Sequence, residues 1–140
     1  IARLLLADVR EVVGQFRQSG TLNLGQAIDE LLTDLPGLRV TKEIPDDLLV
    51  EDPRLAQTIL RCTQELITNT LKHAKAHQIW VKLSSQGGQL LLTVRDDGRG
   101  LGDKEFGNGL KGIQERVAIM NGLFEISDQK GAYVRLTFPM

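Results

Sequence analysis

The chain has 140 residues, enough for one domain with a buried core, and its 17 basic residues nearly balance 18 acidic ones. The net charge of -1 excludes a global field that attracts nucleic acid, so any phosphate binding must be local. A single cysteine excludes a disulfide framework and a cysteine-rich zinc site. Because no apolar run is long enough to span a bilayer, we expect a soluble cytoplasmic protein.

Residues 1–18 form an amphipathic segment at the start of the chain. Apolar residues recur along it at helical spacing: Leu5, Val9, Val12 and Phe16. This apolar surface is larger than a lone terminal helix can bury, so we expect the helix to pack on the domain or on a second helix. Because the chain opens inside this pattern without an initiator Met, we expect a fragment of a longer protein, with residues 1–20 separate from a domain at 21–140.

The next segment predicts a short helix and an edge strand. Asn23 is placed to cap a helix over about residues 24–34. Alternation of apolar and polar residues over 38–44 predicts an edge or half-buried strand. A turn at Pro45-Asp46-Asp47 and a connection over 48–51 then lead to the next helix.

A long helix is predicted from an Asp52-Pro53 cap to about Ala76. Its apolar residues recur at steps of about 3 to 5 along one stripe: Leu55, Ile59, Cys62, Leu66 and Leu71. Because Cys62 falls within this stripe, we interpret its thiol as a buried small hydrophobic group rather than a nucleophile.

A row of polar residues lies beside the apolar stripe of this helix. Glu65, Asn69 and His73 follow at i, i+4 and i+8, and Lys72 lies three residues after Asn69. A carboxylate, an amide, an imidazole and an ammonium group on one face could hold a hard cation and an anionic ligand. The alternative is an ordinary solvated helix face.

The second half of the chain predicts four strands and one helix around a glycine-rich loop. A Gly87-Gly88 pair joins the first two strands as a hairpin, and the second strand is apolar enough to be central. The predicted strands are 78–85, 89–95, 123–127 and 132–138, with the loop at 96–109 and the helix at 110–121. This order predicts an α+β fold, a two-layer sandwich in which helices cover one face of a mixed, mainly antiparallel sheet.

Two glycine clusters occupy the loop. The first, Asp96 to Gly100, follows the central strand, where the Asp96 carboxylate could accept a hydrogen bond from an exocyclic amine such as that of adenine. The second, Gly107 to Gly112, precedes a helix whose free N–H groups could bind phosphate. Neither cluster fits the dinucleotide fingerprint or the P-loop, and either one alone could be a flexible hairpin loop.

Three motifs in order carry a specific resemblance. They are Glu65-x3-Asn69-x2-Lys72-His73-Ala74, Asp96-x-Gly98-x-Gly100 and Gly107-x-Gly109-Leu110-x-Gly112. Together they resemble the N box and two glycine boxes of the gyrase, heat-shock-chaperone, histidine-kinase and MutL ATPase superfamily, over about residues 52–139. The last motif, with Ile113 and Arg116, resembles sensor histidine kinases of the nitrate/nitrite-sensor type, whose second hairpin helix residues 1–18 would match.

The resemblance implies a Bergerat-type fold that binds ATP and Mg²⁺. Asn69 would coordinate Mg²⁺, with Glu65 holding or orienting a metal-bound water, and Lys72 and His73 would lie near the phosphates. Asp96 would read the adenine amine, with Gly98 and Gly100 allowing close approach to the base. The lid and the helix N-terminus at the phosphates would consist of Gly107, Asn108, Gly109, Leu110, Lys111 and Gly112.

The sequence departs from the family pattern in three respects, one of which is that no phospho-accepting histidine motif is visible. Ala132 stands where the family often has a threonine whose hydroxyl assists nucleotide binding, and Thr137 lies too far along the strand to replace it. Neither His73 nor His77 lies in the context of a phospho-accepting histidine, which in this branch would lie upstream of Ile1.

The function implied is that of the ATP-binding catalytic domain of a two-component sensor histidine kinase. It would transfer the γ-phosphoryl group of ATP to a histidine on an upstream hairpin helix, from which a response regulator would take it. The full-length protein is expected to be a homodimer and could be anchored in the inner membrane. Two alternatives stay open: an anti-sigma-factor-like serine kinase on the same fold, and a non-catalytic, nucleotide-gated interaction module whose ATP site has decayed.

Overall fold

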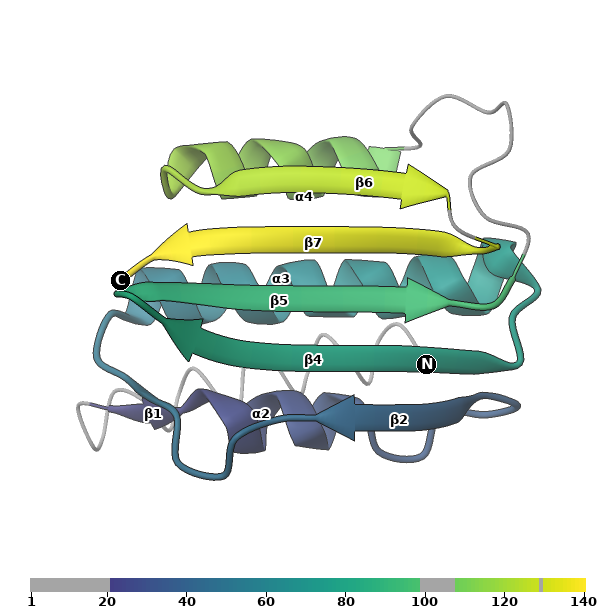
Figure 1. Cartoon of the computed structure of the whole chain (residues 1–140), viewed down its shortest axis with the longest axis horizontal. Helices are drawn as coiled ribbons and strands as arrows, with labels where there is room; N and C mark the ends of the chain where they lie inside the picture. Colours follow the sequence, from purple (N-terminus) through teal and green to yellow (C-terminus); the bar gives the residue numbers. More distant parts are fainter. Residues whose placement is uncertain (1–20, 99–107, 129) are drawn as a thin grey trace.

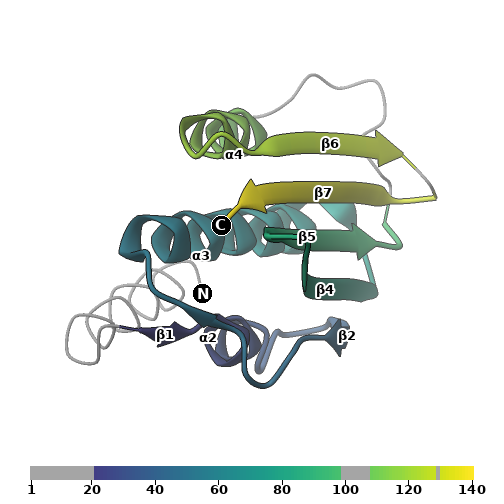
Figure 2. The same cartoon turned by 60° about the vertical axis from the view of Figure 1, so that its left-hand side comes forward.

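The computed structural model describes residues 21–98, 108–128 and 130–140. Within these ranges, a five-stranded sheet forms one layer and three α-helices form the other (Figures 1 and 2). The predicted helix over residues 1–18 and the proposed domain boundary at residue 20 lie outside the described residues, as do Gly100 and Gly107 of the glycine clusters.

The sheet has the strand order β2-β4-β5-β7-β6, in which β2 and β4 run parallel and every other pair runs antiparallel. The strands are β2 (Arg39–Glu43), β4 (Gln78–Gln86), β5 (Gln89–Asp96), β6 (Leu123–Asp128) and β7 (Ala132–Pro139). The mixed, mainly antiparallel sheet, the edge position of β2 and the central position of β5 are confirmed. Gly87 and Gly88 both have positive φ, as a two-residue type I′ hairpin requires.

The helices are α2 (Leu24–Leu31), α3 (Pro53–Asn69) and α4 (Asn108–Ile119). Both predicted N-caps form, since Asn23 Oδ1 accepts the N–H of Gln26 at 3.0 Å and Asp52 Oδ1 accepts that of Arg54 at 2.9 Å. Four helix boundaries differ from prediction. α2 ends at Leu31 instead of residue 34, and α3 ends at Asn69 instead of Ala76. α4 begins two residues before the expected 110 and ends two residues before the expected 121.

Residues 48–51 were predicted to be a simple connection, and this was wrong. β3 (Leu49–Val50) pairs antiparallel with β1 (Leu22–Asn23), and Leu24 N–H donates to the Leu48 carbonyl oxygen at 2.8 Å. A two-residue strand has no periodicity of its own, so its pairing arises from tertiary packing. The small ladder fixes the start of α2 beside the segment that enters α3.

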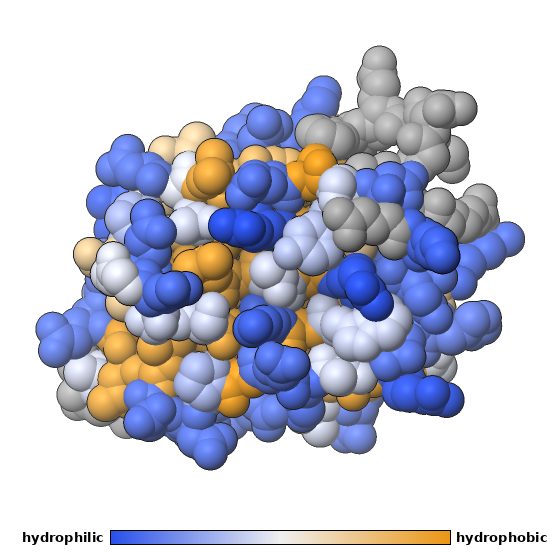
Figure 3. Space-filling model, viewed as in Figure 1, coloured by the Kyte–Doolittle hydropathy of each residue, from blue (hydrophilic) through white to orange (hydrophobic). Residues whose placement is uncertain are grey.

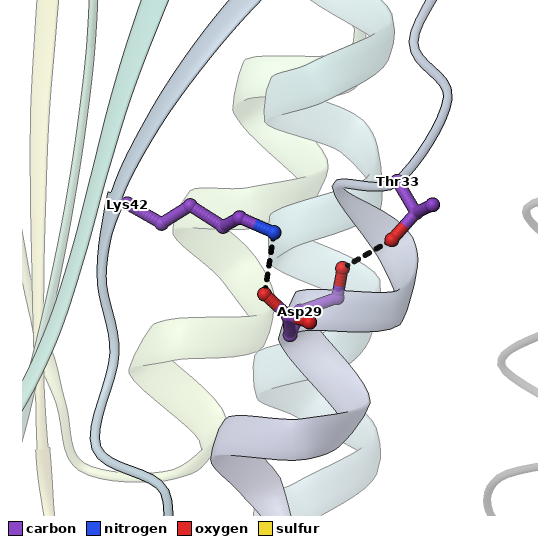
Figure 4. A network of polar contacts seen from close by, with 3 residues as sticks. All are labelled: Asp29, Thr33 and Lys42. Atoms are coloured by element: carbon purple, nitrogen blue, oxygen red, sulfur yellow. Dashed lines mark hydrogen bonds and ion pairs between the residues drawn. The ribbon is translucent and has the colours of Figure 1, made fainter.

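An ion pair joins α2 to the edge strand. Lys42 Nζ on β2 lies 2.6 Å from Asp29 Oδ1 on α2, and the Thr33 hydroxyl donates to the Asp29 carbonyl oxygen at 3.0 Å (Figure 4). Both charged groups are partly exposed, so the pair contributes at most about 1 kcal/mol. It positions α2 against the sheet more than it stabilises the domain.

The core lies between the sheet and the helices. Its largest fully buried side chains are Leu24, Ile28, Leu31, Ile59, Leu60, Ile67, Ile79, Leu90, Leu92, Ile113, Leu136 and Phe138. Cys62 is also fully buried, and desolvation by burial raises the pKa of its thiol to about 12. The thiol is therefore a packing group, as predicted, and its thiolate is not formed at neutral pH.

The other face of the sheet is not covered by the described helices. Across it, the guanidinium carbon of Arg95 lies 4.2 Å from the centre of the Trp80 ring, and Arg135 pairs with Glu125 at 3.4 Å. Figure 3 shows this face, on which hydrophilic side chains are interspersed with apolar areas. None of the helices in the described part of the chain is both long and apolar enough to cross a membrane.

Candidate functional site

Several element ends meet at one edge of the domain. The C-terminal ends of α3 and β5 lie there with the N-terminal ends of β4, β7 and α4, on the right-hand side of Figure 1. The predicted polar row and the described parts of both glycine clusters belong to these ends. Residues from three distant parts of the sequence are thereby brought to one edge.

Asp96 occupies the centre of this edge as the last residue of β5. It is buried, with 5% of its surface exposed, and its Oδ1 accepts the backbone N–H of Gly98 at 2.9 Å and that of Ala132 at 3.2 Å. Its Oδ2 lies 3.4 Å from the hydroxyl oxygen of Thr70. An ionised carboxylate offers about four acceptor positions, so this group retains capacity for a donor from a ligand.

Gly131 permits the close approach of β7 to Asp96. Its φ is +133°, a conformation that L side chains rarely adopt, and a Cβ there would collide with the Asp96 carbonyl oxygen. The glycine therefore lets the next residue, Ala132, present its N–H to the carboxylate. From the sequence, Gly131 was expected only in the turn that joins the last two strands, and its contact with Asp96 was not predicted.

Asn69 and Glu65 lie one turn apart at the end of α3, and both side chains are half-buried. The α-helix was expected to continue to Ala76, but it ends at Asn69 and becomes the π-helix η1 (Thr70–Ala74). The side chain of Asn69 makes no capping hydrogen bond to η1. Its amide is therefore not used to terminate the helix.

Four polar side chains were predicted to form one row at α-helical spacing, and the change to a π-helix shows that this prediction was wrong for the last two, Lys72 and His73. A π turn bonds i to i+5 instead of i+4, so the α-helical spacing holds from Glu65 to Asn69 and not beyond. Lys72 is exposed on this wider turn, and the backbone of His73 belongs to it, whereas the His73 side chain lies outside the description. The turn closes at Lys75, whose φ of +50° is left-handed.

The second glycine cluster opens α4. Asn108 and Gly109 form its first two positions, Leu110 packs partly against the core, and Lys111 is exposed. A Cβ at Gly112 would meet no atom within 4 Å, so this side of the first turn is open. The first N–H groups of a helix have no partner within the helix, and here they begin at the same edge as Asp96.

Asp97 connects the strands β4 and β5 at this edge of the domain. Its Oδ1 accepts the N–H groups of His77 at 2.8 Å and Gln78 at 2.9 Å, which ties the start of β4 to the end of β5. These hydrogen bonds, that from Gln78 first, lower the pKa of the Asp97 carboxyl. Asp97 was not singled out from the sequence. The His77 side chain is exposed.

Thr137 lies at the opposite end of β7, paired with Leu91 and Leu123, so it cannot replace the hydroxyl missing at Ala132. Its hydroxyl oxygen is buried without a hydrogen-bond partner.

We expect Thr137→Val to stabilise the domain by about 1 kcal/mol, because it removes an unsatisfied polar group at nearly constant shape. Thermal unfolding measures this as a midpoint higher by a few degrees, whereas the control Thr93→Val on β5 should show little gain.

The family model of histidine kinase-, DNA gyrase B- and HSP90-like ATPases matches residues 55–140. The sensor histidine kinase YvfT of Bacillus subtilis is 33% identical over 142 residues, which cover 99% of this chain and 38% of that protein. The signal transduction histidine-protein kinase/phosphatase UhpB of Salmonella typhimurium is 34% identical over 141 residues, which cover 94% of this chain and 28% of that protein. The chain thus spans less than two fifths of either relative.

Solved structures share the architecture. The histidine kinase domain of the blue-light activated histidine kinase of Erythrobacter litoralis EL346 superposes with a TM-score of 0.68 at 21% identity, covering 84% of this chain and 61% of that one. The ATP binding domain of PrrB from Mycobacterium tuberculosis gives 0.67 at 17% identity, covering 85% and 95%. At these identities the likeness concerns the fold, and it confirms the predicted two-layer sandwich.

Proposed function

Because the chain belongs to the family of histidine kinase-, DNA gyrase B- and HSP90-like ATPases, we propose that it is the ATP-binding catalytic domain of a sensor histidine kinase. The observation that carries the site assignment is the buried Asp96 carboxylate at the edge where α3, β7 and α4 end or begin. Two backbone N–H groups hold Oδ1, which leaves Oδ2 to accept a hydrogen bond from the exocyclic amine of adenine.

In this proposal the phosphates of ATP extend from the base toward the first turn of α4. The N–H groups of that turn and the positive end of the helix dipole favour an anion there. Lys72 on η1 and Lys111 on α4 are exposed and supply positive charge near the same edge. His73 and the loop residues Gly98, Gly100 and Gly107 are proposed to line the nucleotide, as the three motifs imply.

Asn69 and Glu65 are proposed to hold Mg²⁺ on the phosphates. Within the described residues no group of three or more His, Cys, Asp or Glu could bind a metal by itself. Mg²⁺ in nucleotide sites takes one or two protein oxygens and completes its shell with phosphates and water. The half-buried amide and carboxylate at the end of α3 fit that donor set, and the ion would supply charge neutralisation at the phosphates.

The phosphoryl group would go to a histidine on an upstream hairpin helix of the full-length protein. A ring nitrogen of that histidine attacks the γ-phosphorus, the bond to the oxygen between the β- and γ-phosphorus atoms breaks, and ADP leaves. A response regulator would then accept the phosphoryl group.

We further propose that the full-length protein is a homodimer, in which the catalytic domain can reach a helix of the same or the paired chain. Sedimentation of the intact protein as a monomer would contradict this last point.

Nucleotide binding and the chemistry of the phosphorylated product test the proposal. We expect calorimetry on this chain to show ATP binding that Mg²⁺ strengthens, and the full-length protein incubated with γ-labelled ATP to yield an acid-labile, alkali-stable phosphoryl bond. A product stable to acid would instead indicate a serine kinase. Failure of the chain to bind ATP would favour the non-catalytic alternative, which Ala132 suggests, although the backbone N–H of Ala132 still reaches Asp96.

A further inference from the structure

Thr70, the first residue of η1, is a buried polar residue beside Asp96. Its side chain is 5% exposed, and its hydroxyl oxygen lies 3.1 Å from the Leu66 carbonyl oxygen and 3.4 Å from Asp96 Oδ2. A threonine hydroxyl carries one proton, so it can donate to only one of these two oxygens at a time. The contact spans 26 residues of sequence and joins the end of α3 to the end of β5.

The two oxygens of Asp96 contact different parts of the fold. Oδ1 is fixed by backbone N–H groups from Gly98 and from Ala132 on β7, whereas the hydroxyl of Thr70 approaches Oδ2 from the helix layer. At residue 132 the side chain is a methyl group, so no hydroxyl reaches the carboxylate from β7 at that position. The π turn begins at Thr70, which places this side chain at the point where the helix widens.

We propose that Thr70 is a positioning residue that orients Oδ2 of Asp96 for the exocyclic amine of adenine and thereby contributes to the choice of base. It supplies from η1 the hydroxyl that Ala132 cannot supply from β7. This inference rests on the proposed ATP site, because it gives Thr70 a role only if Asp96 reads the base.

The experiment compares Thr70→Val with Thr63→Val. Thr63 is a matched control, because it is a buried threonine of the preceding helix α3, and its hydroxyl also donates to the carbonyl oxygen four residues earlier, that of Ile59, at 2.8 Å. Calorimetry would measure the affinity for ATP and for purine riboside triphosphate, which lacks the exocyclic amine. We expect Thr70→Val to weaken ATP binding by roughly three- to tenfold and to leave the amine-free analogue within about twofold, whereas Thr63→Val changes neither.

Two further variants test whether a hydroxyl group beside Asp96 is what maintains the affinity for ATP. Thr70→Ser keeps the hydroxyl and should retain the affinity for ATP of the unmodified chain. Adding Ala132→Thr to Thr70→Val should restore ATP affinity, because a hydroxyl then approaches Asp96 from β7. Equal weakening of ATP and the analogue, or no weakening at all, would overturn the role of Thr70 while leaving the ATP site intact. An unmodified chain that binds ATP no better than the analogue would instead overturn the assignment of Asp96, and this inference with it.

Discussion

Replacing Asn69 by alanine is expected to remove the Mg²⁺ dependence of ATP binding and to lower affinity in the presence of Mg²⁺ by roughly 100-fold or more. Loss of even an outer-shell partner of a metal ligand costs about 10- to 100-fold, and Asn69 is proposed to be a direct ligand. Calorimetry with ATP in Mg²⁺ and in a chelator measures both quantities. The variant should give the same weak isotherm in the two buffers.

The fold should survive this substitution. The Asn69 side chain makes no capping hydrogen bond to η1, and alanine has a higher helix propensity than asparagine. Thermal unfolding should therefore be unchanged or slightly higher, which separates a lost ligand from a lost domain. Glu65→Gln, one turn earlier, should weaken binding less, since its proposed contact runs through water. An Asn69→Ala protein that still binds ATP more tightly with Mg²⁺ would remove Asn69 from the metal site.

Periodic patterns were sufficient to predict most of the fold. The alternating residues of β4 and β5 and the Gly87-Gly88 turn are local signals, and each element forms with nearly the predicted bounds. The cap at Asp52 predicted the start of α3 because a side chain that accepts N–H groups must directly precede the helix. The position of Asp96 followed from the central strand that it ends.

The parts that sequence reasoning missed depend on contacts between distant segments. The β1–β3 ladder pairs Leu22 with Val50 and Asn23 with Leu49, residues 28 and 26 positions apart, and neither strand is long enough to show a period. α3 becomes a π-helix at Thr70, the residue whose hydroxyl lies 3.4 Å from Asp96 Oδ2, whereas helix periodicity alone favours a continuous α-helix. The same conversion is what separated Asn69 and Glu65 from the rest of the predicted polar row.

Replacing Asp96 by asparagine should reduce ATP affinity by about 2 to 3 kcal/mol, roughly 30- to 150-fold. The two backbone N–H groups that point at Oδ1 oblige the asparagine to place its amide oxygen there. The amide NH₂ must then occupy the position of Oδ2, where it faces the exocyclic amine of adenine. Two donors oppose each other, so the base contact is lost while the shape and backbone contacts of the residue stay in place.

This geometry makes a sharper test possible, because inosine triphosphate carries a carbonyl oxygen where ATP carries the amine. Asp96→Asn should therefore bind inosine triphosphate better than ATP, whereas the unmodified chain should prefer ATP. The control Asp97→Asn changes the neighbouring carboxylate, whose Oδ1 accepts N–H groups from His77 and Gln78, and it should keep the preference for ATP. If Asp96→Asn folds normally and still prefers ATP by the original margin, the base is read elsewhere, since no other arrangement of its amide satisfies both backbone donors.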